Sequence, residues 1–464
     1  MLQDRYESDK LFTDILKLTS AMDPVLAQID QLLDDEVLYQ LIRQDLSQRY
    51  AQTEQTGRNS TPVEVTLRML AVRRLYGLSY EQTEYQVRDS LVLRQFCRVY
   101  LHAVPDDTTL IRWAALIQPD TLEQFNQRLT QLARHLKVTR GRKLRTDGTV
   151  VETNIHAPSD SSLLADSVRV LGRTLGRAKQ VLGEPAQLGQ AVFRNRTRSV
   201  RRLARQVGEA MRRRGETAQS EGKVAYQKLV QAAQTTIRQA EQMLTALQAQ
   251  ATPECQKLAE TLDTFIPRAK QVVDQTVRRV FEQEKVPAAE KIVSIFEPHT
   301  DIIRRNKAHK PTEYGHKIWL DEVDGGVVTR WEVLEGNPSD EKQWLPSLDH
   351  HQARFGKPPD QASGDRGLYS PQNERIAGER GVKRVILPRP GNKSEARKQH
   401  ERQPWFVRGR RWHAGVEGRI SLLKRRFGLD RCLDHGAHGF EKWVGWAVIT
   451  ANLSAIGRKV AANA

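Results

Sequence analysis

Strand-like and helix-like segments follow one another in this chain in an order that few folds accommodate. Residues 146–153 are rich in β-branched side chains and predict a first strand. Residues 159 to about 290 are dominated by Ala, Gln, Leu and Arg, a composition typical of long helices. Strand patterns return after about residue 309. We therefore expect an α/β fold with a mixed sheet, interrupted after its first strand by a large helical insertion.

The segments after the insertion have their own order. Residues 314–321 and 327–334 predict a hairpin closed by the turn Asp324-Gly325-Gly326. The remaining segments predict a helix over 340–354, a strand over 382–387, a polar basic linker over 393–411, and helices over 412–427 and 440–460.

The first 130 residues or so carry helix start and stop signals. Thr61–Glu64 predicts a capping box with Pro62 at the first helical position, and Gly77 predicts the end of that helix. Ser79 predicts the next start and Asp106 or Asp107 a third. Short helices joined by tight turns resemble a helix-turn-helix reader of DNA, with a packing or dimerisation domain as the alternative. The arginines that such a reader would present are Arg68, Arg73, Arg74, Arg88, Arg94 and Arg98.

The charge balance indicates a polyanionic partner. The 73 Lys and Arg exceed the 56 Asp and Glu by 17, although basicity alone does not separate DNA from RNA or an anionic membrane. Within the insertion, residues 193–214 hold a dense run of arginines with one acid, Glu209, so we expect this run to follow a phosphate backbone rather than to be only a solvated face. Its candidate DNA-binding members are Arg194, Arg196, Arg198, Arg201, Arg202 and Arg205.

The compartment follows from cysteine usage and hydropathy. Cys97, Cys255 and Cys432 are odd in number and far apart, which fits a reducing cytoplasm. The N-terminus has acids and no apolar core of a signal peptide. The most apolar stretch, residues 443–456, is shorter than the ~20 residues that a membrane span requires, so we expect a buried helix there.

Three acids stand in basic or glycine-rich surroundings: Asp147, Asp365 and Glu417. Asp147 begins the β-branched segment, and Asp365 lies between Gly364 and Arg366. Glu417 and Lys424 are seven residues apart and would share one face of a helix. Carboxylate oxygens suit two Mg²⁺ or Mn²⁺ ions, which promote in-line displacement at phosphodiesters.

Two sequence blocks, DGTVVETNIHAPSDSSLLADSVRVLGR at 147–173 and PDDTTLIRW at 105–113, resemble the DDE transposases of bacterial insertion sequences, in particular their ISNCY group. The resemblance implies an RNase H-like catalytic core over 136–158 and 295–464, an all-α N-terminal domain over 1–135 for DNA binding or dimerisation, and a helical insertion over 159–294. It also implies that Asp147, Asp365 and Glu417 are the catalytic triad. Because one acid must bridge the two ions, we expect that acid to be Asp147, and we expect Lys424, on the helix face that carries Glu417, to reach the same phosphate.

One departure concerns a Tyr-Arg-Glu-Lys signature of related enzymes. Glu417 and Lys424 keep its spacing, but Arg410 and His413 stand at the Tyr and Arg positions. We expect Arg366, Arg410 and His413 to contact DNA. Residues Thr153, Asn154, His156 and Asp160 match the family block and either line the site or cap the first helix of the insertion.

The function implied by the resemblance is metal-dependent cleavage of double-stranded DNA at terminal inverted repeats, followed by strand transfer into target DNA. A homodimer in a synaptic complex would hold the two DNA ends. The alternatives are an inactive DNA-binding remnant or repressor of the same family, and, less favoured, an RNA-processing nuclease.

Overall fold

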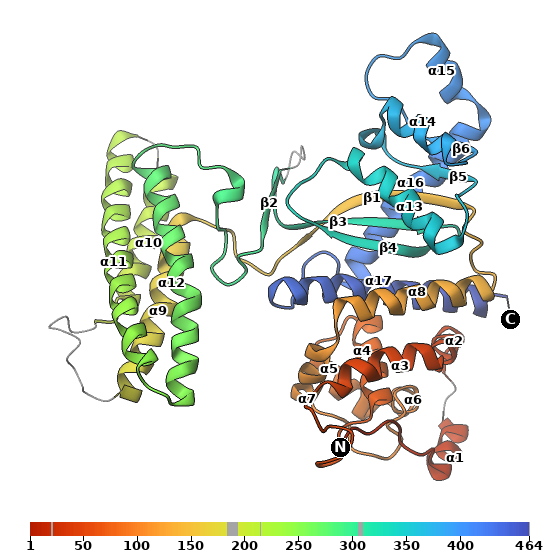
Figure 1. Ribbon diagram of the computed structural model, residues 1–464, viewed down its shortest axis with the longest axis horizontal. Coiled ribbons are helices and arrows are strands. Elements are labelled where there is room, and N and C mark those ends of the chain that lie inside the picture. Colours follow the sequence, from red (N-terminus) through yellow and green to blue (C-terminus); the bar gives the residue numbers. More distant parts are fainter. Residues whose placement is uncertain (20–21, 183–193, 214, 305–309, 464) are drawn as a thin grey trace. The chain divides into compact units, whose positions relative to one another are not determined.

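The computed structural model describes residues 1–19, 22–182, 194–213, 215–304 and 310–463. The chain forms two compact units, one of Met1–Thr153 with His316–Ala464 and one of Asn154–Gly315 (Figure 1). The expected α/β class, with an all-helical N-terminal region and a mixed sheet, is confirmed.

In the described part of the chain, eight helices precede the first strand, and their ends follow local chemistry. Ser79 and Gln82 form the expected reciprocal capping box, Asp106 accepts from the Thr109 N–H at 2.6 Å, and Gly77 ends its helix at φ 67°. The capping box at Thr61 was wrong: Pro62 occupies the cap position in an extended conformation and no side chain caps the helix. The helices are α1 Lys10–Thr19, α2 Pro24–Leu33, α3 Glu36–Ser47, α4 Val63–Tyr76, α5 Tyr80–Asp89, α6 Leu91–Phe96, α7 Asp107–Leu116 and α8 Pro119–His135.

The described residues form a sheet of six strands in the order β2-β3-β1-β5-β6, and β4 also pairs with β3. The predicted hairpin is confirmed, because β3 and β4 are antiparallel and joined through Gly325 and Gly326, both with positive φ. By contrast, β1–β5 and β5–β6 are parallel pairs. The strands are β1 Lys143–Glu152, β2 Asp301–Arg304, β3 Thr312–Val323, β4 Val327–Leu334, β5 Gln361–Ser363 and β6 Arg384–Ile386.

The last helix, α17 (Gly436–Ala461), is the buried helix expected from the apolar stretch, and it packs against α2, α8 and β4 (Figure 1). The Asn452 side chain accepts from the Val328 N–H at 2.9 Å and donates to Asn126 of α8 at 2.8 Å. These buried amides fix α8, β4 and α17 to one another, since each satisfies polar atoms that would otherwise be lost from water. Within the described residues, no helix is long and apolar enough to cross a membrane.

The predicted linker over 393–411 was wrong, because α15 (Glu395–Arg402) and most of the first half of α16 (Pro404–Phe427) lie there. Residues of α15 form ion pairs rather than an apolar stripe: Arg397 binds Glu374 at 2.7 Å and Glu401 at 2.9 Å, and Lys393 binds Glu401 at 2.5 Å. Hydrophobic periodicity does not detect a helix held in this way. Two further helices of this unit, α13 (Trp344–Phe355) and α14 (Pro371–Glu379), lie between the hairpin and α15 in the sequence.

In the second unit, the residues that the structure describes form a bundle of four α-helices with its own hydrophobic core: α9 Asp160–Leu182, α10 Thr197–Arg212, α11 Glu216–Gln248 and α12 Pro253–Val280. Asp160 is buried at the start of α9, where it accepts from Gln275 at 3.0 Å and Arg279 at 2.7 Å, both on α12. Of the two roles left open for Asp160, these contacts support the structural one.

A buried histidine on α13 predicts acid sensitivity. His351 is 1% exposed, its ring nitrogen lies 3.0 Å from the Gly141 carbonyl, and burial lowers its pKa to about 4. The unfolded chain therefore binds this proton near pH 6.5 while the folded chain does not, so stability is lost as the pH falls from about 6.5 towards 4. We expect His351 to contribute about 2 kcal/mol to the loss of unfolding free energy between pH 7 and 5.

Urea unfolding at pH 7 and pH 5 measures this difference. His351→Gln should reduce the pH dependence, and His135→Gln, at an exposed position on α8, should not. An unchanged pH dependence in His351→Gln would contradict the assignment.

Candidate active site

The register of two parallel strands brings Asp147 and Asp365 side by side. Lys143 pairs with Gln361, Leu144 with Ala362 and Arg145 with Ser363. Each aspartate comes two residues after the last of these pairs, so the two lie at the same level at the end of β5. Residues 218 positions apart in the sequence are thus neighbours across one pair of strands.

The backbone holds Asp365 tightly. Its carboxylate accepts from the N–H groups of Gly367 at 2.9 Å and Leu368 at 3.2 Å. Before it, Gly364 is required, because a Cβ there would lie 2.6 Å from the Leu368 side chain. Asp365 is exposed as a residue, but partial desolvation of its carboxyl group raises the pKa of that group. The nearby Asp340 also raises this pKa, while the two N–H groups and Lys317 lower it.

Asp340 and Lys317 were missed by the sequence analysis. Lys317 on β3 binds Asp340 at 2.5 Å and donates to the Pro338 carbonyl at 2.7 Å. Asp340 and Lys317 have opposite effects on the pKa of Asp365, which Asp340 raises and Lys317 lowers. No spacing in the sequence signals this contact, because it joins β3 to the turn before α13 and to the end of β5.

Helix α16 is anchored along β1 at both ends of its second half. Arg145 donates to the Trp412 carbonyl at 2.6 Å, and Lys424 donates to the Val150 carbonyl at 2.7 Å. Glu417 lies between these anchors, on the face it shares with Lys424, and is exposed. The helix therefore places Glu417 along the segment of β1 that contains Asp147.

His413, one turn before Glu417, packs beside β5. Its ring meets the Ser363 carbonyl, two residues before Asp365, while burial and the nearby Arg145 lower its pKa to about 4. The ring is therefore neutral at neutral pH and supplies no positive charge to a phosphate. Arg366 and Arg410, the other expected DNA contacts near the acids, are exposed.

The donor set has the right chemistry for a divalent cation, because all three acids offer hard oxygen ligands. Within the described residues, however, no group of three or more His, Cys, Asp and Glu side chains is close enough to hold a metal ion. The register thus leads two acidic positions to the same level of neighbouring strands, and the third acid stands on helix α16.

The arginine run of the insertion is mostly α10 of the bundle. The buried face of α10 consists of Val200, Leu203, Val207 and Ala210. Arg196 is half-buried and donates to Gln239 at 2.9 Å. The other candidates lie on the exposed side or just before the helix: Arg194, Arg198, Arg201, Arg202 and Arg205. The two ends of the predicted run, Phe193 and Arg214, lie outside the described residues.

Comparison with known protein families identifies a domain in the N-terminal region. Residues 14–116 match DUF772, a transposase domain. The DUF772 segment covers α2 to α7, while Asp147, Asp365 and Glu417 lie beyond it. No curated protein and no solved structure matches the chain significantly.

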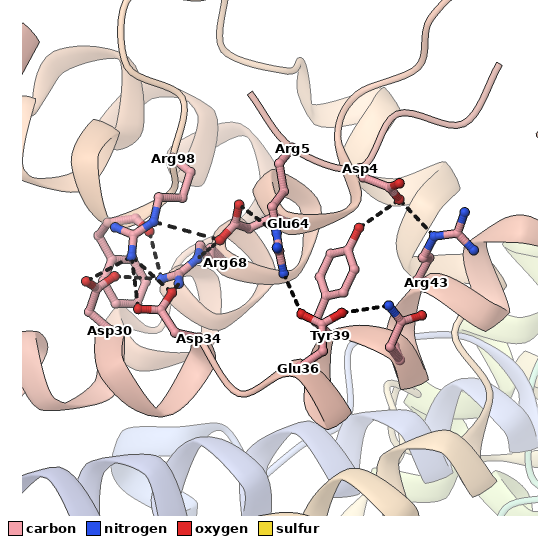
Figure 2. Close-up of polar contacts among 12 residues, drawn as sticks. Asp4, Arg5, Asp30, Asp34, Glu36, Tyr39, Arg43, Glu64, Arg68 and Arg98 are labelled. Carbon is pink, nitrogen blue, oxygen red and sulfur yellow. Dashed lines mark hydrogen bonds and ion pairs between the residues drawn. The ribbon is translucent and has the colours of Figure 1, made fainter. Parts of the chain in front are cut away.

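The arginines of the DUF772 segment do not form the DNA-reading surface that we expected. Arg68 is fully buried and binds Asp30 at 2.6 Å and Asp34 at 2.5 Å, and Arg98 binds both acids at 3.1 Å (Figure 2). These ion pairs join α2, α4 and the segment after α6.

The remaining arginines of this set have other surroundings. Arg73 and Arg74 are buried, and Arg94 donates to the carbonyls of Tyr100 and His102. Arg88 is exposed and paired with Glu84. The arginines are unavailable for different reasons that a local pattern does not reveal: acids of the α2 region bind Arg68 and Arg98, burial covers Arg73 and Arg74, and backbone carbonyls bind Arg94.

Proposed function

We propose that this protein is a DDE-type DNA transposase, with an RNase H-like catalytic core, that cleaves DNA at the ends of its element and transfers the strands into target DNA. The observation that carries the proposal is the β1–β5 register, which sets Asp147 beside Asp365, with Glu417 on a helix anchored along β1. The transposase match of residues 14–116 supports the same class.

In this proposal Asp147, Asp365 and Glu417 hold two Mg²⁺ or Mn²⁺ ions. When bound, such ions activate the attacking water or 3′-hydroxyl and stabilise the leaving oxygen. Because no three acids among the described residues are close enough to hold an ion together, joint coordination by Asp147, Asp365 and Glu417 would require them to move closer when DNA and metal bind. The raised pKa of Asp365 opposes its ionisation in the free protein, so a bound cation would compensate the repulsion from Asp340.

The other residues of the site act through position and charge. The Lys424 ammonium fixes α16 against β1 through the Val150 carbonyl. The exposed guanidinium groups of Arg366 and Arg410 would bind phosphates of the DNA next to the acids. Neutral His413 would keep α16 against the end of β5 rather than contact a phosphate through charge. Two copies of the chain would hold the two DNA ends.

Strand cleavage tests the proposal. Wild type and Glu417→Gln are compared on a labelled duplex that carries the element's own ends, with Mg²⁺ and with Mn²⁺. We expect cleavage by the wild type alone. Glu379→Gln is the control, because Glu379 is exposed at the end of α14 and pairs with Arg375. DNA binding by every protein without cleavage by any would instead indicate a DNA-binding remnant or repressor.

The bundle arginines predict a salt effect that does not depend on cleavage. Replacing Arg201, Arg202 and Arg205 together by Gln should lower the slope of log affinity against log salt by about 2.7, because each lost phosphate contact removes ~0.9. Fluorescence anisotropy of a labelled duplex over a salt series measures the slope. Lys270→Gln on α12, where Lys270 pairs with Glu241, is the control, and an unchanged slope in the triple variant would remove the bundle from the DNA interface.

A further inference from the structure

A pocket of about 380 Å³ lies in the first unit between α4, α7 and the start of α17, away from the three acids. Its polar lining includes Arg73, Arg74 and Lys442, with Asp434 as the acid, and Trp446 and Tyr80 form part of its wall. Three cations thus face one carboxylate and the ring of His435. The excess of positive charge indicates an anionic ligand.

The two arginines are buried without the partners that buried arginines normally have. Arg73 is 8% exposed and Arg74 is 5% exposed, and neither Nε atom has a hydrogen-bond partner in the described part of the chain. Arg73 lies over the Tyr80 ring at 3.9 Å, while Arg74 lies over the Trp443 ring at 3.7 Å and donates to the Trp443 carbonyl at 3.2 Å. No ion pair to either arginine is present among the described residues.

Arg68, on the same helix, is a buried arginine whose charge is compensated by acids. Its buried guanidinium meets Asp30, Asp34 and Glu64, whereas Arg73 and Arg74 face each other's charge. Burial and Arg73 lower the pKa of Arg74 to about 10. Asp434 attracts Arg74 but forms no ion pair with either arginine in the described part of the chain. Because two buried like charges with so little compensation are costly, an anion in the pocket would supply what is missing.

The mouth of the pocket bears exposed hydrophobic side chains. Ile111 is 47% exposed and Leu433 is 56% exposed, and both line the pocket. Lys442 is fixed at one wall by the Ala115 carbonyl at 3.0 Å and the Ala114 carbonyl at 3.3 Å. An apolar rim around a positively charged interior matches a phosphate group attached to a larger, partly apolar molecule.

We propose that this pocket binds a phosphate group, on Arg73, Arg74 and Lys442. The phosphate belongs either to a DNA backbone or to a free nucleotide, since both offer the same chemistry. The inference goes beyond the proposed function, because it requires neither the three acids nor strand cleavage.

Substitutions that place a charge at the mouth of the pocket test the proposal without altering the buried core of the unit. Ile111→Glu should weaken binding of 5′-dAMP and pyrophosphate about fivefold by repulsion, whereas Ile111→Lys should keep or improve it. Isothermal titration calorimetry of the full chain gives these affinities, and anisotropy of a labelled duplex gives the affinity for DNA. The same pair of substitutions at Val37, which is 47% exposed on α3 and does not line the pocket, controls for the overall charge of the surface.

Arg74→Met provides a second variant, which removes the charge and keeps much of the length. We expect at least about a tenfold loss of phosphate affinity, with circular dichroism to show that the chain is folded. If duplex affinity follows the Glu–Lys difference at Ile111 and pyrophosphate competes with the duplex, the source is DNA; if only dAMP and pyrophosphate respond, it is a free nucleotide. Equal behaviour of the Ile111 variants towards all three ligands, or equal effects at Val37, would overturn the proposal.

Discussion

Replacement of Asp147 by Asn should reduce metal-dependent strand cleavage about 10³-fold or more while DNA binding persists. Asn keeps the size of the side chain and removes the charge that would hold the cations. Asp147 has the largest expected effect because it stands on β1, beside Asp365 through the strand register and along α16. The measurement is single-turnover cleavage of the labelled element ends in Mg²⁺, with anisotropy for binding.

Asp360→Asn is a matched control for this substitution. Asp360 comes directly before β5 and its side chain pairs with Lys383 at 2.8 Å on the surface. It removes one carboxylate from the same strand region without touching the proposed ligands, so cleavage should remain close to that of the wild type. Full cleavage by Asp147→Asn would show that the site has been placed wrongly.

Arg68→Ala should lower the free energy of unfolding by about 3–5 kcal/mol. The fully buried guanidinium bridges Asp30 and Asp34 of the α2 region and Glu64 of α4 (Figure 2). Removing it leaves a cavity and carboxylates that Arg98 alone must compensate. Urea unfolding followed by circular dichroism measures the change.

Arg88→Ala shows what an exposed pair contributes in the same region. Arg88 and Glu84 are four residues apart on α5, and we expect a change of about 0.5 kcal/mol or less. If the Arg68 and Arg88 variants were equally stable, the ion pairs of Figure 2 would not be what holds α2 and α4 together.

Much of the fold was predictable where the signal is local. The Ser79 capping box, the Gly77 helix end and the Gly325-Gly326 hairpin depend on a few adjacent residues, and each was predicted in its place. Helix α15 was not, because ion pairs between Arg397, Glu374 and Glu401 stabilise it without an apolar stripe.

The candidate site was predictable only as a set of residues. Their unusual surroundings singled out Asp147, Asp365 and Glu417, and their roles as metal ligands remain predictions. The contributions of Asp340 and Lys317 were not foreseen, since they reach Asp365 from other elements of the fold. The charge of His413 was also not foreseen, because burial rather than residue type lowers its pKa.

The sequence by itself determined the broad succession of helical and strand regions, the excess of positive charge and which acids stand in unusual surroundings, because these depend on residue type and short spacing. Only the tertiary structure decided which charges are available. Among the described residues, it paired Arg68 and Arg98 with acids of the α2 region, left Arg73 and Arg74 buried without an ion pair, and exposed most of the arginines of α10. The physical reason is that a charge acts according to its burial and its neighbours, and both are set by residues far away in the chain.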